Sequence, residues 1–414
     1  MRAPRIYTLM SKGSMKRFLV CLMLLVWVSP AWSAKKISVQ ELTDLLRSFE
    51  EEKKSDAEVG NALKQVELTE QLTRTALNSL VGHVSGPMST EQIYVLEARS
   101  ANLVPPAADL PVVPAPDEAV RKAVLAKAEN YVTRIYDQLP ALTATRTTLR
   151  FQDNMEALAA SSGLGSGAKE AVTSSGFTKP IAYVHYVNST ASAVASDHGA
   201  EKKPAEADGT KWGANGMTAV QEPTPSLGRV FKEAMAAGNL QWLRWELING
   251  KRMAVFSYAV PKEKSKLALK VCCFPNINQA GVATFYTAST AAALGGPGAN
   301  PGGGVAGNFQ THTEWHDYKS TAPYHGRLFV DPETGVVARL IVETELKPGE
   351  VVHQLDTRVD YGPVKAGAKT FIAPVKTVIN AVVVPNGDSG AGGYSTRCTL
   401  LTSQYSGYRQ GGAQ

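Results

Sequence analysis

Apolar residues recur at helical spacing from residue 35 to residue 103. Capping-box patterns, in which Ser precedes Glu or Gln by three positions, begin at Ser38, Ser55 and Ser89. Behind the first two, apolar side chains follow at steps of three and four: Val39, Leu42, Leu46, Phe49, Val59, Leu63 and Val66. This period predicts a small bundle of amphipathic helices over residues 34–103.

Five prolines then fall between Pro105 and Pro116. Proline has no backbone N–H, so such a run cannot continue a helix and favours a semi-rigid, extended connector. We expect residues 104–116 to link two units. After them Asp117 caps a long helix, whose predicted apolar stripe is Val120, Val124, Ala128, Tyr131 and Ile135.

From about residue 140 the pattern alternates between apolar and polar positions, which is typical of β-strands. The clearest pair flanks Asn249-Gly250, because these two residues adopt the positive φ angles of a two-residue hairpin turn. The predicted strands are Thr145–Phe151, Ile181–Val187, Trp242–Ile248, Met253–Tyr258, Leu267–Phe274, Val352–Tyr361, Thr370–Val384 and Tyr394–Tyr405, and a helix runs from Ser226 to about Ala237.

The stretch YHGRLFVDPETGVVARLIVETEL, residues 324–346, places two acids between apolar runs. They could belong to a catalytic or metal site, or to a turn between two further strands. Asp331-Pro332 is a typical turn start, since an Asp side chain accepts hydrogen bonds from nearby backbone amides. Gly335 supplies the left-handed residue that ends the turn. We therefore assign both acids, Asp331 and Glu333, to a solvated turn.

These patterns predict an α+β protein with roughly ten strands. We expect an N-terminal helical bundle over residues 34–103, a Pro-rich linker over 104–116 and a β domain over 117–414. A sheet of this size is expected to curl, here into an antiparallel half-barrel with the helices as a lid.

Residues 1–33 have the pattern of a secretory signal peptide. Five basic residues and no acid accompany an apolar run from Phe18 to Val28, and small residues follow. We predict cleavage between Ser33 and Ala34, with Met1 or Met15 as the start; an uncleaved anchor is the alternative. The apolar run is shorter than the about 20 residues that span a membrane. We therefore expect export to the periplasm or the exterior, and no integral membrane protein after cleavage.

The predicted cleavage changes the interpretation of charge. The whole chain has a formal net charge of +6, but loss of the five basic residues leaves 38 basic against 37 acidic residues. No basic block interleaved with aromatic residues remains. We expect no nucleic-acid partner.

The cleaved chain keeps Cys272, Cys273 and Cys398. Adjacent strand residues face opposite sides, so one of the first two faces inward and could form a disulfide with Cys398 in an oxidising compartment. Burial of the three thiols as small hydrophobic side chains is the alternative.

Other motifs give weak signals for chemistry. His312 and His316, with Glu314 or Asp317, could hold a metal, but a polar loop accounts for them equally well. The glycine-rich residues 295–307 lack the Gly-Lys-Ser/Thr ending of a phosphate loop. No GxSxG motif occurs. We predict no catalytic residue, no metal and no cofactor.

Several short motifs resemble known proteins: Tyr324-His-Gly326, Phe329–Gly335, Arg339-Leu340, Asp360-Tyr361-Gly362 and Pro374. Together they resemble a group of uncharacterised secreted acidobacterial proteins over most of the cleaved chain. From about residue 117 the chain is also similar, more weakly, to the half-barrel fold of periplasmic lipoprotein carriers and sigma-factor regulators. That resemblance implies a concave apolar face that holds an acyl chain or a peptide.

Three functions follow as hypotheses. The first is a non-enzymatic exported protein that binds a lipid, a lipoprotein, a peptide or another apolar ligand. The second is an envelope protein–protein interaction module or scaffold, in which the helical bundle contacts a partner. The third is a hydrolase or metalloenzyme.

Overall fold

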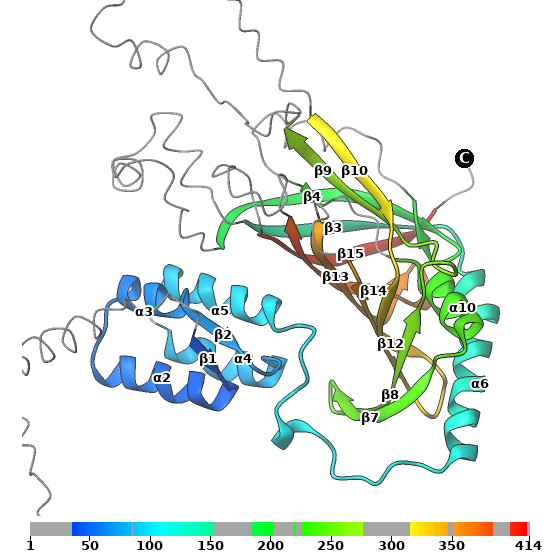
Figure 1. Cartoon of the computed structure of the whole chain (residues 1–414), viewed down its shortest axis with the longest axis horizontal. Helices are drawn as coiled ribbons and strands as arrows, with labels where there is room; N and C mark the ends of the chain where they lie inside the picture. The colour runs from blue at the N-terminus through cyan, green and yellow to red at the C-terminus, as the bar shows by residue number, and fades with distance from the viewer. Residues whose placement is uncertain are drawn as a thin grey trace, which may run out of the picture.

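The computed structural model describes residues 35–84, 86–152, 184–202, 219–220, 225–275, 315–346, 352–383 and 398–411. Their largest element is a ten-stranded sheet (Figure 1). From edge to edge its strands are β5 (Ala200–Glu201), β4 (His185–Asp197), β3 (Leu142–Gln152), β15 (Cys398–Gln410), β14 (Lys369–Val383), β13 (Val352–Ala366), β12 (Val337–Thr344), β11 (Tyr324–Val330), β8 (Lys251–Val260) and β7 (Gln241–Ile248). All neighbouring strands are antiparallel, which confirms the α+β class and the large antiparallel sheet.

The described sheet is open and not strongly curled (Figure 1). The edge strands β5 and β7 do not pair with each other, so the ten strands do not close. The strong curl predicted for a half-barrel is therefore absent from these strands. Helices pack on both faces of the sheet, and a sheet covered on both faces has no free concave side to close over.

One face of the sheet is covered by α6 (Glu118–Arg134), the 3₁₀ helix η4 (Tyr136–Gln138) and α10 (Leu227–Ala237). The Asp117 side chain caps α6, accepting a hydrogen bond from the Val120 amide at 2.8 Å. The predicted apolar stripe is correct at Val124, Ala128 and Tyr131, which are buried. It is wrong at Val120 and Ile135, which are 45% and 53% exposed, because the residues of α6 that pack into the main core lie between Val124 and Val132.

The main hydrophobic core lies between these helices and the sheet. Each central strand contributes every second side chain to it, as expected for a pleated sheet with one buried apolar face. The strand residues are Ala254, Phe256, Tyr258 and Val260 from β8, Leu328 and Val330 from β11, Leu340 and Val342 from β12, and Val359 and Tyr361 from β13.

The N-terminal unit comprises β1 (Lys35–Ile37), α2 (Val39–Glu51), α3 (Asp56–Leu63), β2 (Val66–Leu68), α4 (Arg74–Leu80), η2 (Val81–His83) and α5 (Pro87–Arg99) around its own core. Capping boxes at Ser38 and Ser55 are confirmed. Ser89 is not an N-cap residue: α5 begins at Pro87 after the N-cap Gly86, and the Ser89 hydroxyl accepts from the Gly86 N–H at 3.4 Å and donates to Asp56 at 2.5 Å. The parallel pair β1–β2 was not predicted, because three-residue strands are too short to show alternation.

Two smaller features complete the described structure. A three-stranded sheet contains β10 (Trp315–Thr321), β9 (Ala268–Pro275) and β6 (Ala219–Val220), and the connector contains the 3₁₀ helix η3 (Ala107–Asp109). Within the described ranges, no helix is both long and apolar enough to cross a membrane.

Candidate functional site

The sheet face opposite α6 carries a row of charged side chains. The strand register places Arg339 next to Asp360 and Asp360 next to Lys376, while Glu343 lies opposite Asp356. Their immediate chain neighbours, such as Leu340 on β12, point into the main core on the other side. We call this set the charged face: Arg244, Glu246, Arg327, Arg339, Glu343, Asp356, Arg358, Asp360 and Lys376.

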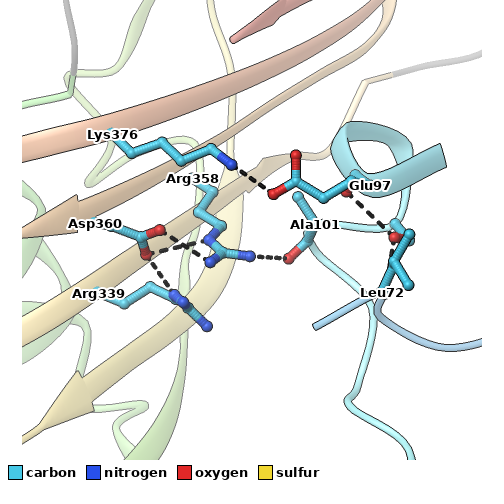
Figure 2. A network of polar contacts seen from close by, with 8 residues as sticks. Leu72, Glu97, Ala101, Arg339, Arg358, Asp360 and Lys376 are labelled. Atoms are coloured by element: carbon cyan, nitrogen blue, oxygen red, sulfur yellow. Dashed lines mark hydrogen bonds and ion pairs between the residues drawn. The ribbon is translucent and has the colours of Figure 1, made fainter. Parts of the chain in front are cut away.

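Asp360 lies at the centre of the charged face between two arginines (Figure 2). Its carboxylate is 2.5 Å from Arg339 Nε and 2.9 Å from Arg358 Nη2. Burial alone would raise the pKa of Asp360, but the two guanidinium groups outweigh burial and hold this pKa well below its ordinary value. Asp360 therefore stays ionised and fixes both arginine side chains.

The end of α5 packs against cationic side chains of the charged face (Figure 2). Arg358 Nη1 donates to the Ala101 carbonyl at 3.0 Å, Arg327 donates to the Asn102 carbonyl, and Lys376 Nζ is 2.5 Å from Glu97 Oε1. Carbonyl groups at a helix C-terminus carry partial negative charge, so cationic side chains are favourable there. Hydrogen bonds and an ion pair from the charged face thus hold the C-terminal end of α5.

Apolar contacts complete the docking of α5. Val95, Ala98 and Ala101 pack on Val378 and Leu400, in one cluster with other buried residues of β3 and β15. Near the other end of the helix, the Gln92 side chain donates to the Val184 carbonyl at 3.4 Å. We call the contact of residues 91–102 with the sheet the α5–sheet interface. It joins the N-terminal unit to the sheet directly, in addition to the connector.

A cavity of about 130 Å³ lies at this interface. Its polar lining comes from both units: Arg99, Asn102, Glu343, Gln354, Asp356 and Asn380. Arg99 is exposed at the end of α5, whereas the other lining side chains are at least partly buried or lie on the sheet. The cavity therefore opens where the helical unit meets β12, β13 and β14.

Asp356 is the most unusual side chain in this cavity. It is only 9% exposed, and it accepts a hydrogen bond of 2.5 Å from Gln354 Nε2. Burial raises the pKa of Asp356 to about 6; the Gln354 hydrogen bond lowers this pKa and the neighbouring Glu343 charge raises it. No ion pair between Asp356 and a described cation accompanies these contacts.

The opposite face of the sheet offers far less space. A cavity there is lined by the aromatic side chains of Tyr136, Tyr361, Tyr405 and Tyr408 and has a volume of about 30 Å³. That volume is roughly the share of one water molecule. This described cavity is therefore much smaller than the one at the α5–sheet interface.

The residues assigned to turns lie between strands. Asn249 and Gly250 have φ angles of 51° and 77° between β7 and β8. Gly335 has a φ of 77° and donates its N–H to the Asp331 carbonyl at 2.8 Å, directly after Pro332, Glu333 and Thr334. The solvated environment predicted for both acids holds for Glu333, whose side chain is 81% exposed, and is wrong for Asp331, which is 5% exposed.

Asp331 is buried where the turn contacts the start of the neighbouring strand β8. Its carboxylate lies 2.6 Å from Lys251 Nζ and accepts hydrogen bonds from the Thr334 hydroxyl at 2.6 Å and the Glu333 amide at 3.0 Å. Burial would raise the pKa of Asp331, but these three contacts lower it below the ordinary value. The contacts of Asp331 therefore stabilise the turn, and Asp331 does not line the cavity at the α5–sheet interface.

Several predicted residues fall outside what the structure describes. The predicted cleavage site, Ser33 and Ala34, lies outside the described ranges, and so does His312. The side chains of Cys272, Cys273 and His316 lie outside it as well, so the disulfide stays a prediction. Cys398 is buried at the start of β15, with its Sγ 3.9 Å from Asn380 Oδ1.

The charged face was missed by sequence reasoning. Alternating charged residues such as Arg339, Arg358 and Asp360 are also typical of a solvated strand face, so the pattern alone does not reveal burial. The available signal was the number of arginines at alternating positions in strands that are otherwise strongly apolar. Arginine is the usual residue for buried ion pairs.

Comparisons with known proteins give no relative to draw on: no protein-family model, no curated protein and no solved structure matches the chain. Among the described residues, no group of three or more His, Cys, Asp or Glu side chains could hold a metal ion.

Proposed function

We propose that this chain is an exported, non-enzymatic interaction protein, and that its partner binds at the α5–sheet interface. The observation that carries the proposal is that two units, each with its own core, meet at a polar, cavity-containing surface. Contacts of this kind between units resemble transient protein–protein interfaces, which are more polar than permanent ones. A partner that contacts both units would recognise their docked arrangement.

The export that this proposal assumes rests on the signal-peptide pattern of residues 1–33. The resemblance to secreted acidobacterial proteins points the same way. Both belong to the proposal.

Binding of an apolar ligand is the alternative, supported by the resemblance to half-barrel carriers. It requires an open apolar interior under α6 and α10, with these helices as the lid. The cavity of about 30 Å³ on that side is too small for an acyl chain. This observation favours the interaction proposal. Lipid extraction from the purified protein, followed by mass spectrometry, tests the alternative, and a stoichiometric lipid would support it.

Site-specific photo-crosslinking in the native organism tests the interaction proposal. A photoreactive residue replaces Arg99, beside the cavity, or Glu345, which is exposed and lies two residues beyond Glu343 on the same side of the sheet. The matched control replaces Asp44, which is exposed on α2. We expect one protein to be captured from positions 99 and 345 and not from position 44.

The same experiment includes a charge swap across the interface. Lys376→Glu places two acids against each other and should abolish capture from position 99, whereas the double variant Glu97→Lys/Lys376→Glu should restore it. Equal capture from all three positions, or capture that ignores the swap, would contradict a partner site at the α5–sheet interface.

A further inference from the structure

Asp356 differs from the other buried acids of the sheet in its partners. Asp360 contacts two guanidinium groups, and Asp331 contacts the Lys251 ammonium group. Asp356 is equally buried, but its described partners are the Gln354 amide and the Thr344 backbone, and it lines a cavity. A buried carboxylate is normally paired with a cation, because desolvation of an unpaired charge is costly. The cavity beside Asp356 offers space for a cation.

The lining of the cavity is suited to a positive ligand. Glu343 lies directly opposite Asp356 in the strand register, and the side-chain amides of Gln354, Asn380 and Asn102 can each offer a carbonyl oxygen. Glu343 is 3.7 Å from both His325 and Arg327, whereas Asp356 is affected by the charge of His325 without forming an ion pair with a described cation. The volume of about 130 Å³ accommodates a charged head on a short alkyl chain.

We propose that the cavity at the α5–sheet interface binds an organic ammonium group, with Asp356 as its principal acceptor. The inference rests on the proposed function, since it names the chemistry recognised at that interface. An ammonium group has three N–H donors, which two carboxylates and an amide oxygen can accept together. A divalent metal ion fits less well, because no group of three or more His, Cys, Asp or Glu side chains among the described residues could hold one.

Two sources could supply such a group: the lysine side chain of a partner protein, or a free alkylamine. Both sources present the same ammonium group. Titration with a lysine derivative and with a free alkylamine distinguishes them. The charged groups around Asp356 are Glu343 on β12, His325 and Arg327 on β11, and Arg99 on α5. Binding should weaken below pH about 6, because protonation of Asp356 removes its charge.

Isothermal titration calorimetry on the full chain at pH 7.5 tests the inference. The ligands are n-butylammonium chloride, Nα-acetyl-lysine methylamide and, as neutral controls, n-butanol and the Nε-acetylated lysine derivative. The variants are Asp356→Asn, which keeps the shape and removes the charge, and Asp44→Asn, which makes the same change at an exposed acid on α2. Arg99→Ala tests whether the Arg99 side chain itself occupies the cavity.

We expect saturable binding of at least one ammonium ligand and none of the neutral controls. Asp356→Asn should weaken binding at least tenfold, Asp44→Asn should change it less than twofold, and Arg99→Ala should leave it equal or tighter. Preference for the lysine derivative indicates a partner's lysine, and preference for butylammonium indicates a free amine.

Absence of saturable binding to any ammonium ligand would overturn the inference, as would equal binding by folded Asp356→Asn. If photo-crosslinking at positions 99 and 345 still succeeds in that case, the interaction function stands and only its proposed chemistry fails. If crosslinking fails while ammonium binding depends on Asp356, the cavity binds a small amine and the partner proposal fails.

Discussion

Asp356 is a residue at which stability and the proposed binding oppose each other. Its pKa is 3.8 in the ordinary state and about 6 in the folded protein, because burial penalises the charged form. Between these values the folded state binds more protons than the unfolded state, so the free energy of unfolding falls as the pH rises from about 4 to about 6. Above pH 6 the ionised carboxylate costs about 1–3 kcal/mol, since one pKa unit corresponds to about 1.4 kcal/mol.

Asp356→Asn should therefore stabilise the protein at pH 7. Asn keeps the hydrogen bond with Gln354 without the buried charge, so we expect an increase of about 1–3 kcal/mol in the free energy of unfolding. Urea unfolding at pH 4, 5.5 and 7 measures this, and the variant should lose the fall in stability that the wild type shows between pH 4 and 6. A variant less stable than the wild type at pH 7 would contradict the assignment.

Gly335 is a second residue with a specific structural requirement. Its φ of 77° is strained for a β-branched residue, and an added Cβ would lie 2.4 Å from the backbone C and O atoms of Lys127 in α6. Gly335→Val should therefore lower the free energy of unfolding by more than about 2 kcal/mol, since strain and overpacking add.

Glu333→Gln is the matched control in the same turn. The Glu333 side chain is 81% exposed, so its change should be within about 0.5 kcal/mol. Thermal melts of both variants decide between a structural and a catalytic role for this stretch. An unchanged melting temperature in Gly335→Val would contradict the assignment of this stretch to a turn. Loss of partner capture in a stably folded Glu333→Gln variant would contradict it as well.

At the scale of elements, α5 depends on one largely buried ion pair. The side chains of Lys376 and Glu97 are 18% and 16% exposed, so removal of one partner leaves a poorly solvated charge behind. We expect Glu97→Gln and Lys376→Met each to cost about 1–3 kcal/mol. The double variant should cost clearly less than the sum of the two, with a coupling energy of about 1–2 kcal/mol.

A double-mutant cycle by urea unfolding gives this coupling energy directly. The salt bridge between Lys122 and Glu118 on α6 provides the control, because both side chains are at least three-quarters exposed and such pairs contribute little. Additive effects of Glu97→Gln and Lys376→Met would show that the docking of α5 does not depend on this pair.

Local elements could be predicted from the sequence, and their pairing could not. The capping boxes at Ser38 and Ser55 and the Asn249-Gly250 turn depend on a few adjacent residues, so short motifs contain the needed information. By contrast, β15 pairs with β3, more than 240 residues earlier, through Leu401 and Arg150 among others. Nothing in either strand alone specifies this partner, because alternation sets a face and leaves the neighbour undetermined.

The candidate site was hidden for a related reason. Whether Arg358 faces solvent or the end of a helix depends on the docking of residues 91–102, which the Pro-rich connector gives no reason to expect. In the predicted strand Val352–Tyr361, alternation alone places Arg358 and Asp360 on one face and Val359 on the other. The structure has the same arrangement. Burial of that face arises from the long-range contact with residues 91–102. The local alternation of polar and apolar residues carries no information about this contact.

At the scale of the whole molecule, the sheet lies between two helical layers. Helices α6 and α10 fill one face with apolar side chains, and α5 covers part of the charged face on the other (Figure 1). The Pro-rich connector alone predicts two units held apart by a semi-rigid spacer. The contacts of α5 with Val378, Ala101 with Arg358 and Glu97 with Lys376 predict instead one body with a cavity inside its joint.

Hydrogen–deuterium exchange on the full chain tests this central claim most directly. Amides of residues 91–99 in α5 should be protected nearly as well as those of β13, and Lys376→Glu should speed their exchange at least tenfold while leaving α2 unchanged. Restoration of protection in Glu97→Lys/Lys376→Glu would complete the result that we predict. Exchange in α5 that is unaffected by Lys376→Glu, or that in the wild type is already as fast as in residues 104–116, would contradict a docked α5–sheet interface.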